Sequence, residues 1–320
     1  NPLDVLTGLP QGLDHVSGRV VFGPDAKLYV SVGDQGNNFA ANRCNVNHAQ
    51  DLPTAAEVRA KDWKSYQGKI LRMNLDGSIP ADNPVLKGVR SHVYTYGHRN
   101  VQGMVFGPDG KMYASEHGQG TDDEVNLIEA GKNYGWPYVA GYRDDQSYVY
   151  AMWPKSAPEP CSSWLSLNGN DMTLVPKSVP VQKESEWSHP DFREPLKTFF
   201  TVANGYSWQA SGSATIAPSG LGIYTGSEIP GWKNSLLVLG MTKGRVYRLL
   251  LSADGRSAGE PQELFQSQNR YRDVVIAQDN RTIYFVTDVQ GRRTTDARGA
   301  STTTIAEPEA ILEFKYTGSR

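Results

Sequence analysis

The sequence predicts an all-β protein and, within that class, a β-propeller. A hairpin unit recurs along the chain, since residues 20–31 are echoed closely by residues 104–115 and more weakly by residues 274–286. The 320 residues include 32 glycines, 19 prolines and 16 tyrosines, a turn-rich and aromatic composition that favours β-structure. A β-sandwich is the main competing architecture, but a sandwich would not repeat one hairpin signature over so much of the chain.

Each repeat is expected to form a strand, a tight turn and a second strand. In the second repeat Pro108 fixes φ for the turn, and Asp109 and Gly110 suit the positions that follow. The flanking runs are β-branched and aromatic, as in short buried strands. Further strands are expected at residues 68–74, 91–96, 222–225, 235–240, 245–251 and 310–316, and a short helix at 54–63. Together these elements predict a single propeller domain over residues 1–320.

The bulk composition excludes several functions. The formal net charge is −2, from 32 basic and 34 acidic residues, which gives no support to nucleic-acid binding. No run approaches 18 apolar residues, so no membrane-spanning helix is expected, and the first residues do not read as a signal peptide. The two cysteines, Cys44 and Cys161, form neither a disulfide framework nor a zinc site. Whether they form one bridge or remain two thiols is left open.

The segment 96–103 has the densest set of polar groups directly before an apolar strand. Arg99 offers a planar fork of donors that stays charged near neutral pH. Asn100 and Gln102 add neutral donors and acceptors, and Gly97 and Gly103 allow close approach of the backbone. This combination suits an anionic, carbonyl-rich ligand. The alternative is an ordinary polar turn between two strands.

Similar polar clusters stand at equivalent places in the three repeats. His15 and Arg19 precede the first repeat, Arg99 and Gln102 precede the second, and residues 269–273 precede the third. In a propeller, equivalent positions of successive units point towards one central axis. We therefore expect the three clusters to meet in one site, which argues against three unrelated turns.

The residues at these positions also resemble a known family, the soluble pyrroloquinoline-quinone (PQQ)-dependent glucose/aldose sugar dehydrogenases. The matching stretches are residues 14–19, 33–36, 68–80, 97–103, 122–128, 133–137, 183–187 and 269–273. The resemblance implies a six-bladed propeller that binds PQQ and calcium. It implies oxidation of an aldose at its anomeric carbon to the lactone, with a hydride passing to the quinone and electrons leaving to an external acceptor. It also implies a periplasmic or secreted protein and leaves a homodimer among the options.

The resemblance assigns roles to the polar clusters. His15 falls at the general base, a role for which histidine has a suitable pKa, and the adjacent Asp14 would orient it. Arg99 falls where a guanidinium faces the quinone carbonyl, whose negative charge grows as hydride arrives. The cofactor-binding positions are Arg99, Asn100, Gln102, Lys243, Arg270 and Arg272. The last two match a pair that meets the carboxylates of the cofactor.

Calcium ligands also follow from the resemblance. The carbonyls of Gly118 and Gln119 match those that bind the catalytic ion, although the family usually has proline at the second position. A structural calcium pair near the dimer interface of the family is matched by the acidic residues Glu124, Asp144 and Glu184, together with the backbone carbonyls of Tyr134, Ala140 and Tyr142.

Four departures from the family pattern put sugar specificity in doubt. Family members have about two more blades before the position of Asn1, so this chain is expected to supply roughly four blades of an open arc. At the substrate rim, Phe39 and Ala40 replace a polar and a larger aliphatic residue. In the stretch 203–213, Trp208 or Tyr206 is expected to stack over the site in place of a longer loop. Thr242 replaces a cofactor-binding lysine, a role that neighbouring Lys243 is expected to take.

Two other functions compete with sugar oxidation. The first is a non-enzymatic propeller that binds a protein or a carbohydrate, because relatives of this fold exist without redox chemistry. The second is a calcium-dependent hydrolytic propeller, which would open a lactone without quinone.

Overall fold

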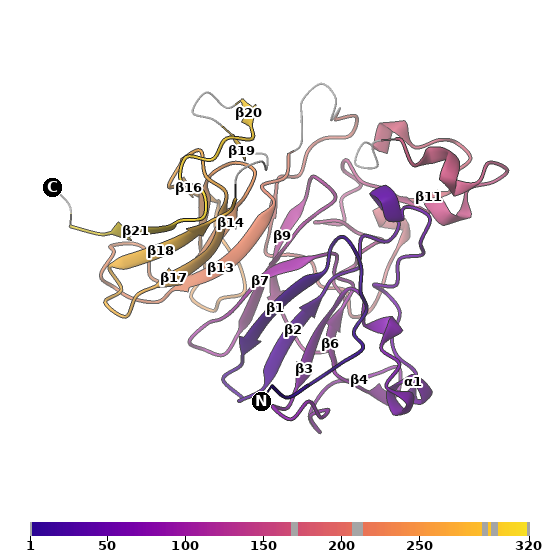
Figure 1. Ribbon diagram of the computed structural model, residues 1–320, viewed down its shortest axis with the longest axis horizontal. Helices are drawn as coiled ribbons and strands as arrows, with labels where there is room; N and C mark the ends of the chain where they lie inside the picture. Colours follow the sequence, from indigo (N-terminus) through magenta and orange to yellow (C-terminus); the bar gives the residue numbers. More distant parts are fainter. Residues whose placement is uncertain (1, 168–171, 207–213, 290–293, 296–299, 319–320) are drawn as a thin grey trace.

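The all-β expectation is confirmed by the computed structural model of the chain, which describes residues 2–167, 172–206, 214–289, 294–295 and 300–318. Four antiparallel sheets follow one another in chain order and stand side by side (Figure 1). Within the described residues none of these sheets closes on itself.

Three of the sheets have four strands and the last has three. The first comprises β1 (Ser17–Phe22), β2 (Leu28–Val32), β3 (Lys69–Met73) and β6 (Val93–Tyr96). The second comprises β7 (Val101–Phe106), β8 (Met112–Glu116), β9 (Asp123–Ile128) and β12 (Lys197–Phe199). The third comprises β13 (Pro218–Tyr224), β14 (Ser235–Gly240), β15 (Val246–Leu250) and β16 (Gln262–Leu264). The fourth comprises β17 (Tyr271–Ile276), β18 (Thr282–Thr287) and β21 (Ile311–Lys315).

Smaller elements decorate the connections. Three two-stranded ribbons pair β4 (Val85–Leu86) with β5 (Val89–Arg90), β10 (Tyr150–Ala151) with β11 (Val181–Gln182), and β19 (Thr294–Thr295) with β20 (Ser301–Thr302). Short 3₁₀ turns are η1 (Ala40–Asn42), η2 (Lys64–Tyr66), η3 (Trp153–Lys155), η4 (Cys161–Trp164), η5 (Met172–Leu174) and η6 (Glu184–Glu186).

The predicted hairpin repeats are confirmed, because each forms the first two strands of a sheet. The pairs are β1–β2, β7–β8 and β17–β18. The expected helix is also present, but it is shorter: α1 covers Ala55–Ala60. Its start is fixed by a capping box in which Thr54 Oγ1 accepts from the Glu57 amide and the Glu57 carboxylate accepts from the Thr54 amide. Lys61, in the left-handed conformation, ends it.

The apolar core lies between neighbouring sheets. Tyr29 and Ile70 of the first sheet pack with Met104 and Met112 of the second. A larger cluster joins the second sheet to the third, and Tyr271 and its neighbours join the third to the fourth. Because every strand alternates its side chains between two faces, each central sheet contributes to two such layers.

The first strands of the four sheets are tied together by polar contacts. The Arg19 guanidinium on β1 donates from Nε to the Gln102 carbonyl on β7 (2.9 Å) and forms an ion pair with Asp273 on β17 (2.9 Å). Ser31 donates to the Val101 carbonyl (3.1 Å), and Ser115 donates to the Ser219 carbonyl (3.3 Å). The polar clusters that precede the repeats are thereby held near one another.

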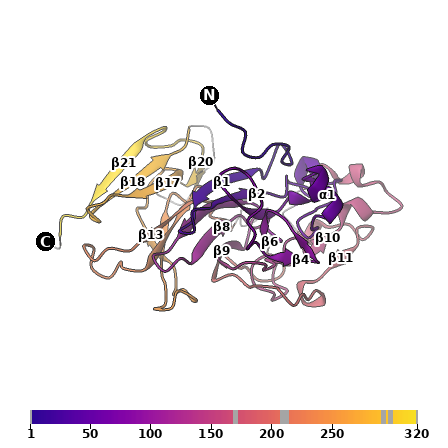
Figure 2. The same ribbon diagram turned by 90° about the horizontal axis from the view of Figure 1, so that it is seen from below.

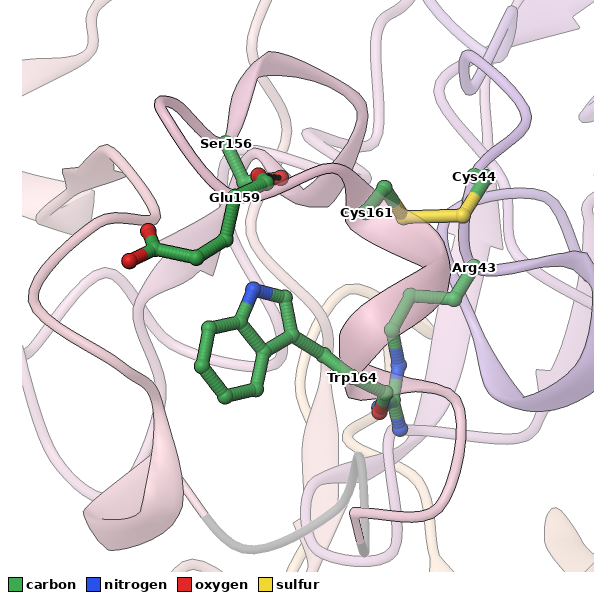
Figure 3. The surroundings of a disulfide bond; sticks show 6 residues. All are labelled: Arg43, Cys44, Ser156, Glu159, Cys161 and Trp164. Carbon is green, nitrogen blue, oxygen red and sulfur yellow. Dashed lines mark hydrogen bonds between the residues drawn. A yellow bond between two sulfur atoms is a disulfide. The ribbon is translucent and has the colours of Figure 1, made fainter.

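A long excursion between β9 and β12 lies on the side of the molecule opposite the C-terminal sheet (Figure 2). Its turn η4 is bound to the connection between β2 and β3 by a disulfide between Cys44 and Cys161 (Figure 3). Beside the disulfide, the buried Arg43 guanidinium donates to the carbonyls of Trp164 and Leu167 and lies 4.3 Å from the Trp153 ring centre. The open question about the two cysteines is settled in favour of one bridge.

Candidate active site

His15 stands at the mouth of β1 and is held by a buried carboxylate. Its side chain is 7% exposed, and its Nδ1 lies 2.8 Å from Oδ1 of Asp34, which is fully buried after β2. Asp14 contacts the backbone amide of His15, but its carboxylate is 3.8 Å from Nε2 and about half exposed. The residue that orients the imidazole in this structure is therefore Asp34, while the role expected for Asp14 stays a prediction.

Asp34 is itself fixed from several sides. Its Oδ1 also accepts from the Gly36 amide (2.9 Å), and its Oδ2 accepts from Asn47 Nδ2 (2.9 Å) and Trp136 Nε1 (2.7 Å). Burial alone would raise the pKa of Asp34, but attraction to His15 and Arg99 and the hydrogen bonds hold it below its usual range. Asp34 is therefore anionic and positioned to stabilise a positive charge on His15.

Arg99 lies beside this pair and is 5% exposed. Its guanidinium is 5.2 Å from the ring centre of Phe39 and 5.3 Å from that of Trp136. The Phe39 ring in turn stacks on the His15 imidazole at 5.5 Å. Phe39, expected at the substrate rim, thus contacts both of the groups to which sequence reasoning assigned chemistry.

The charge on Arg99 is only partly matched by protein groups. Its Nη1 donates weakly to the His117 carbonyl (3.4 Å), and its Nε is buried with no hydrogen-bond partner among the described residues. Burial lowers the pKa of Arg99, whereas the carboxylates of Asp34 and Asp14 act in the opposite direction. A buried guanidinium with a donor to spare is suited to hold an oxygen-rich ligand.

A pair of buried carboxyl groups lies behind Arg99. The Arg99 amide donates to Glu116 (3.0 Å), and Asn126 Nδ2 bridges Glu116 (3.0 Å) and Glu124 (2.8 Å). Burial raises the pKa of both carboxyls, and mutual repulsion adds to the rise at Glu124. The pair supports the backbone at Arg99 from the interior.

The three polar clusters do converge electrostatically. Burial, together with the positive charges of Arg99, His15 and Arg272, lowers the pKa of His117 to about 3, although a hydrogen bond to the Pro218 carbonyl acts in the opposite direction. Asp123 similarly acts on both Arg99 and Lys243. Side chains from all four sheets or their connections therefore share one electrostatic environment.

Asn100 and Gln102 follow Arg99 into β7. The Asn100 Oδ1 accepts from Gln102 Nε2 (2.9 Å) and from Ser17 Oγ (3.1 Å), which links the mouth of β7 to that of β1. Both amides are oriented by these bonds. They are placed near Arg99, as the cofactor-binding prediction requires, although nothing in the structure tests that role.

Arg270 and Arg272 are joined by a carboxylate that sequence reasoning did not single out. The Asp288 Oδ2 lies 3.0 Å from Arg270 Nε and 3.1 Å from Arg272 Nη2. Burial opposes ionisation of Asp288, but the Val289 amide and the two arginines hold its pKa below the usual range. Asp288 thereby holds the two guanidinium groups close to each other.

The other residues predicted to contact cofactor or substrate are Lys243, Ala40, Tyr206 and Trp208. Lys243 is half-buried, and burial lowers its pKa. Ala40 begins η1 directly after Phe39. Tyr206 is described, but Trp208 lies outside the described residues.

The turn at Gly118 and Gln119 follows β8 beside Arg99. The Gly118 amide donates to Asp123 Oδ1 (2.9 Å), and a Cβ at Gly118 would collide with the carbonyl oxygens of Thr121 and Asp122. Backbone carbonyl oxygens of Thr121 and Asp122 therefore lie close to Gly118, while the predicted role of the Gly118 and Gln119 carbonyls as calcium ligands stays a prediction.

The expected structural calcium set is only partly assembled. The Ala140 amide donates to Glu184 (2.9 Å), the Gly141 amide donates to Glu124 (2.7 Å), and the Asp144 amide lies 3.3 Å from Glu184. The Tyr134 hydroxyl donates to the Leu127 carbonyl (2.6 Å), a contact that leaves the predicted role of the Tyr134 backbone carbonyl untested. No group of three or more acidic, histidine or cysteine side chains could hold a metal ion among the described residues. The structural calcium pair stays a prediction.

The comparisons with known proteins now add to this geometry. The model of the Glucose / Sorbosone dehydrogenase family matches residues 5–166 and 187–295. The chain is 44% identical to quinoprotein glucose dehydrogenase B of Acinetobacter calcoaceticus, over 98% of this chain and 67% of that protein. The PQQ-bound aldose sugar dehydrogenase of Streptomyces coelicolor superimposes with a TM-score of 0.56 at 27% identity, covering 96% of this chain and 64% of that one.

The protein thus has an all-β fold that is similar in structure to PQQ-dependent sugar dehydrogenases. The chain belongs to the Glucose / Sorbosone dehydrogenase family. It spans about two thirds of the length of the glucose dehydrogenase and slightly less of the Streptomyces enzyme. In the described part of the chain, no helix has the length and hydropathy needed to cross a bilayer.

Proposed function

We propose that this chain carries the reactive site of a PQQ-dependent sugar dehydrogenase that oxidises an aldose at its anomeric carbon to the lactone. The observation that carries the proposal is the buried His15–Asp34 pair beside Arg99. It combines a positioned base with a buried cation that retains an unpaired donor. The family and its quinoprotein relatives support the same chemistry.

The residues fit the cofactor. Arg99 Nε has no hydrogen-bond partner among the described residues, and Asp288 holds the guanidinium groups of Arg270 and Arg272 side by side, an arrangement suited to an anionic ligand. Arg99, Asn100, Gln102, Lys243, Arg270 and Arg272 would hold PQQ. When bound, PQQ supplies a two-electron acceptor that takes up hydride from the sugar.

The chain then has two tasks in the reaction. With Nδ1 bonded to Asp34, the His15 Nε2 atom is left to accept the proton of the anomeric hydroxyl. Asp34 stabilises the imidazolium that results, in the way that a buried carboxylate supports a catalytic histidine in hydrolases. Arg99 stabilises negative charge that grows on a neighbouring oxygen, and this favours the transition state over the ground state.

Calcium would be held beside Arg99 by the carbonyls of Gly118 and Gln119, where the turn already concentrates carbonyl oxygens. It would neutralise negative charge close to the cofactor. A structural calcium pair would be held at Glu124, Asp144 and Glu184, and its supporting observation is that the neighbouring Asp122 Oδ2 atom is buried without a hydrogen-bond partner among the described residues.

We also infer that the four sheets are blades of a longer propeller. The supporting observation is that both ends of the row present exposed apolar side chains. They are Val20 and Phe22 on β1, and Val275 and Ile311 on the fourth sheet. Two further blades would cover these side chains.

The disulfide bears on where the protein works. Stable disulfides form in oxidising compartments, so the Cys44–Cys161 bridge favours the periplasm or the exterior. An external electron acceptor would collect the electrons there. A homodimer is consistent with the family resemblance and is tested by measuring mass in solution.

The test is reconstitution of the full-length protein that contains this chain. After addition of PQQ and calcium, cofactor binding is followed by absorbance, and turnover of glucose and other aldoses by reduction of an artificial acceptor dye. We expect turnover that depends on both additions and that His15→Ala abolishes without loss of PQQ binding. Bound PQQ without turnover of any aldose would contradict the proposal.

A further inference from the structure

An open cavity of about 640 Å³ lies next to the connection between β2 and β3, with residues from three separate segments around it. Its lining is dominated by six side-chain amides, from Gln11, Gln35, Asn37, Asn42, Asn45 and Gln67. Its volume is within the range of small-molecule sites. None of the cofactor-binding or base residues proposed above lines it.

The lining is mostly polar, and its one titratable residue is His48, whose Nδ1 lies 2.7 Å from the Asp51 carboxylate outside the cavity lining. Among its described residues there is no aspartate, glutamate, lysine or arginine. Each amide can donate two hydrogen bonds and also accept. A surface of this kind complements a neutral ligand whose groups both donate and accept, and it offers little to an ion.

The amides are already oriented in relation to one another. Asn37 Nδ2 donates to Gln67 Oε1 (2.9 Å), Asn45 Nδ2 donates to Asn37 Oδ1 (3.2 Å), and Asn42 Nδ2 donates to the Gln35 carbonyl (3.0 Å). These bonds fix which face of each amide remains for a ligand. Such an arrangement lowers the entropy that binding would otherwise cost.

Gln35 carries a further sign of a missing partner. Its side chain is buried, and its Nε2 donates to the Gly33 carbonyl (2.9 Å). Its Oε1, however, has no hydrogen-bond partner among the described residues. A buried acceptor without a donor costs about 1–3 kcal/mol. Because Oε1 is closed to solvent as the side chain stands, a ligand hydroxyl would recover this cost only when the Gln35 amide turns towards the cavity.

The walls of the cavity are firmly held. The buried Lys69 ammonium donates to the carbonyls of Gln67 (2.6 Å), His48 (3.2 Å) and Ala49 (2.9 Å). Cys44, another lining residue, is bonded to Cys161 of η4 (Figure 3). Two lining positions are thus anchored by Lys69 and a third by a covalent bond.

We propose that this cavity is a second sugar-binding site, specific for neutral saccharides and distinct from the place where the aldose is oxidised. Sugar hydroxyls donate and accept, as the six amides do, and the exposed side chain of Val46 offers a small apolar surface for a ring C–H face. A peptide is the less favoured ligand, because no lining residue belongs to a strand that could extend by β-pairing.

The site is coupled to the catalytic residues through the backbone. Gln35 directly follows Asp34, and its amide lies 3.4 Å from the His15 carbonyl. The same connection carries Phe39, which stacks on His15. The proposal does not rest on sugar oxidation, because binding here needs neither PQQ nor a reducing sugar.

The experiment is calorimetric titration of the full-length apo-protein with sugars that cannot be oxidised at the anomeric carbon. The panel comprises the methyl glycosides of glucose, galactose, mannose and N-acetylglucosamine, together with sucrose and trehalose. The variants are Asn45→Ala/Gln67→Ala, which removes two amides, and Asn45→Trp, which fills the mouth at an exposed position. Gln262→Ala, an exposed amide on β16, is the matched control.

We expect at least one sugar of the panel to bind to the wild-type protein. Both cavity variants should raise the Kd for this sugar about tenfold or more, and the control variant should leave the Kd unchanged. Glucose turnover should remain in both variants, which separates this result from loss of the oxidising site. Three outcomes would overturn the proposal: no binding by any sugar, equal binding by wild type and both cavity variants, or tighter binding of a capped neutral tripeptide. Binding by the 320-residue chain alone, and not by the full-length protein, would equally overturn it.

Discussion

The Nδ1 atom of His15 lies 2.8 Å from Oδ1 of Asp34, although the two residues are 19 positions apart in the chain. The antiparallel pairing of β1 with β2 creates this contact, because it places the start of β1 beside the end of β2. A base is thereby supported by a carboxylate that also accepts hydrogen bonds from Gly36, Asn47 and Trp136.

Replacing the Asp34 carboxylate tests whether it supports His15 as a base. In Asp34→Asn the orienting hydrogen bonds change and the charge that stabilises protonated His15 is lost, so we expect kcat to fall about 100-fold or more while PQQ still binds. Asp14→Asn is the matched variant and should cost far less, because Asp14 lies farther from the ring and is exposed to water. Equal losses in the two variants would favour Asp14 as an equal partner. Steady-state dye reduction provides the measurement.

Phe39 is expected to influence substrate binding and the position of Arg99 together. In Phe39→Ala both ring contacts disappear, each worth about 0.5–1.5 kcal/mol, so kcat/KM for aldoses should fall about tenfold. Phe39→Leu, which retains apolar bulk, should lose less. An unchanged kcat/KM in Phe39→Ala would remove Phe39 from the site.

The Arg270–Asp288–Arg272 group gives a prediction for cofactor affinity alone. Lysine cannot reproduce a planar fork, so Arg270→Lys should raise the Kd for PQQ about tenfold or more, as followed by absorbance titration. Arg281→Lys, at an exposed position, is the control and should bind normally. A normal Kd in Arg270→Lys would place the cofactor carboxylates elsewhere.

The disulfide should contribute substantially to stability. It closes a loop of 117 residues, for which a cost of about 2–4 kcal/mol on removal is typical. We expect Cys44→Ser/Cys161→Ser to unfold at lower denaturant concentration than wild type. Dithiothreitol should lower the wild-type midpoint towards that of the variant and leave the variant unchanged. A midpoint that is the same with and without the bridge would contradict the expectation.

Lys69 gives a prediction for pH. Burial depresses the pKa of Lys69 from 10.5 to about 7. Between pH 7 and pH 10.5 the Lys69 amine keeps its proton in the unfolded chain but has lost it in the folded chain. The contribution of Lys69 to the free energy of unfolding therefore rises with pH in this range. Below pH 7 the amine is protonated in both states. The free energy of unfolding of wild type relative to Lys69→Met should therefore increase from pH 7 to pH 10. The control variant Lys233→Met alters an exposed residue, so the difference in the free energy of unfolding between wild type and this variant should not change with pH.

Much of this arrangement could be predicted from local patterns. The recurring turn around Pro108 and Asp109 identified hairpins, and hairpins repeated in order predicted a row of sheets. His15, Arg99 and Arg270 could be selected because each precedes a repeat. The number of blades in the complete protein stays a prediction, since the chain spans about two thirds of its relative.

The residues that were missed are those whose importance depends on tertiary contacts. Asp34 was visible only as part of a Gly-Asp-Gln-Gly turn, and Asp288 only as an acid after a strand. Neither carries a local sign of its partner, because His15 reaches Asp34, and Arg270 reaches Asp288, through strand pairing. A useful signal would have been register: an acid at the end of the second strand lies opposite a base at the start of the first.

The hydroxyls of Ser31 and Ser115 donate to main-chain carbonyls of the following sheet. A join made through main-chain atoms does not depend on which side chains the neighbour carries. Each sheet could therefore diverge in sequence, and acquire its own loops and ligands, without altering the angle at which it meets the next. At the third junction the Ser219 hydroxyl, on the first strand of its sheet, donates to the Tyr271 carbonyl, so the same kind of join is made there from a different strand.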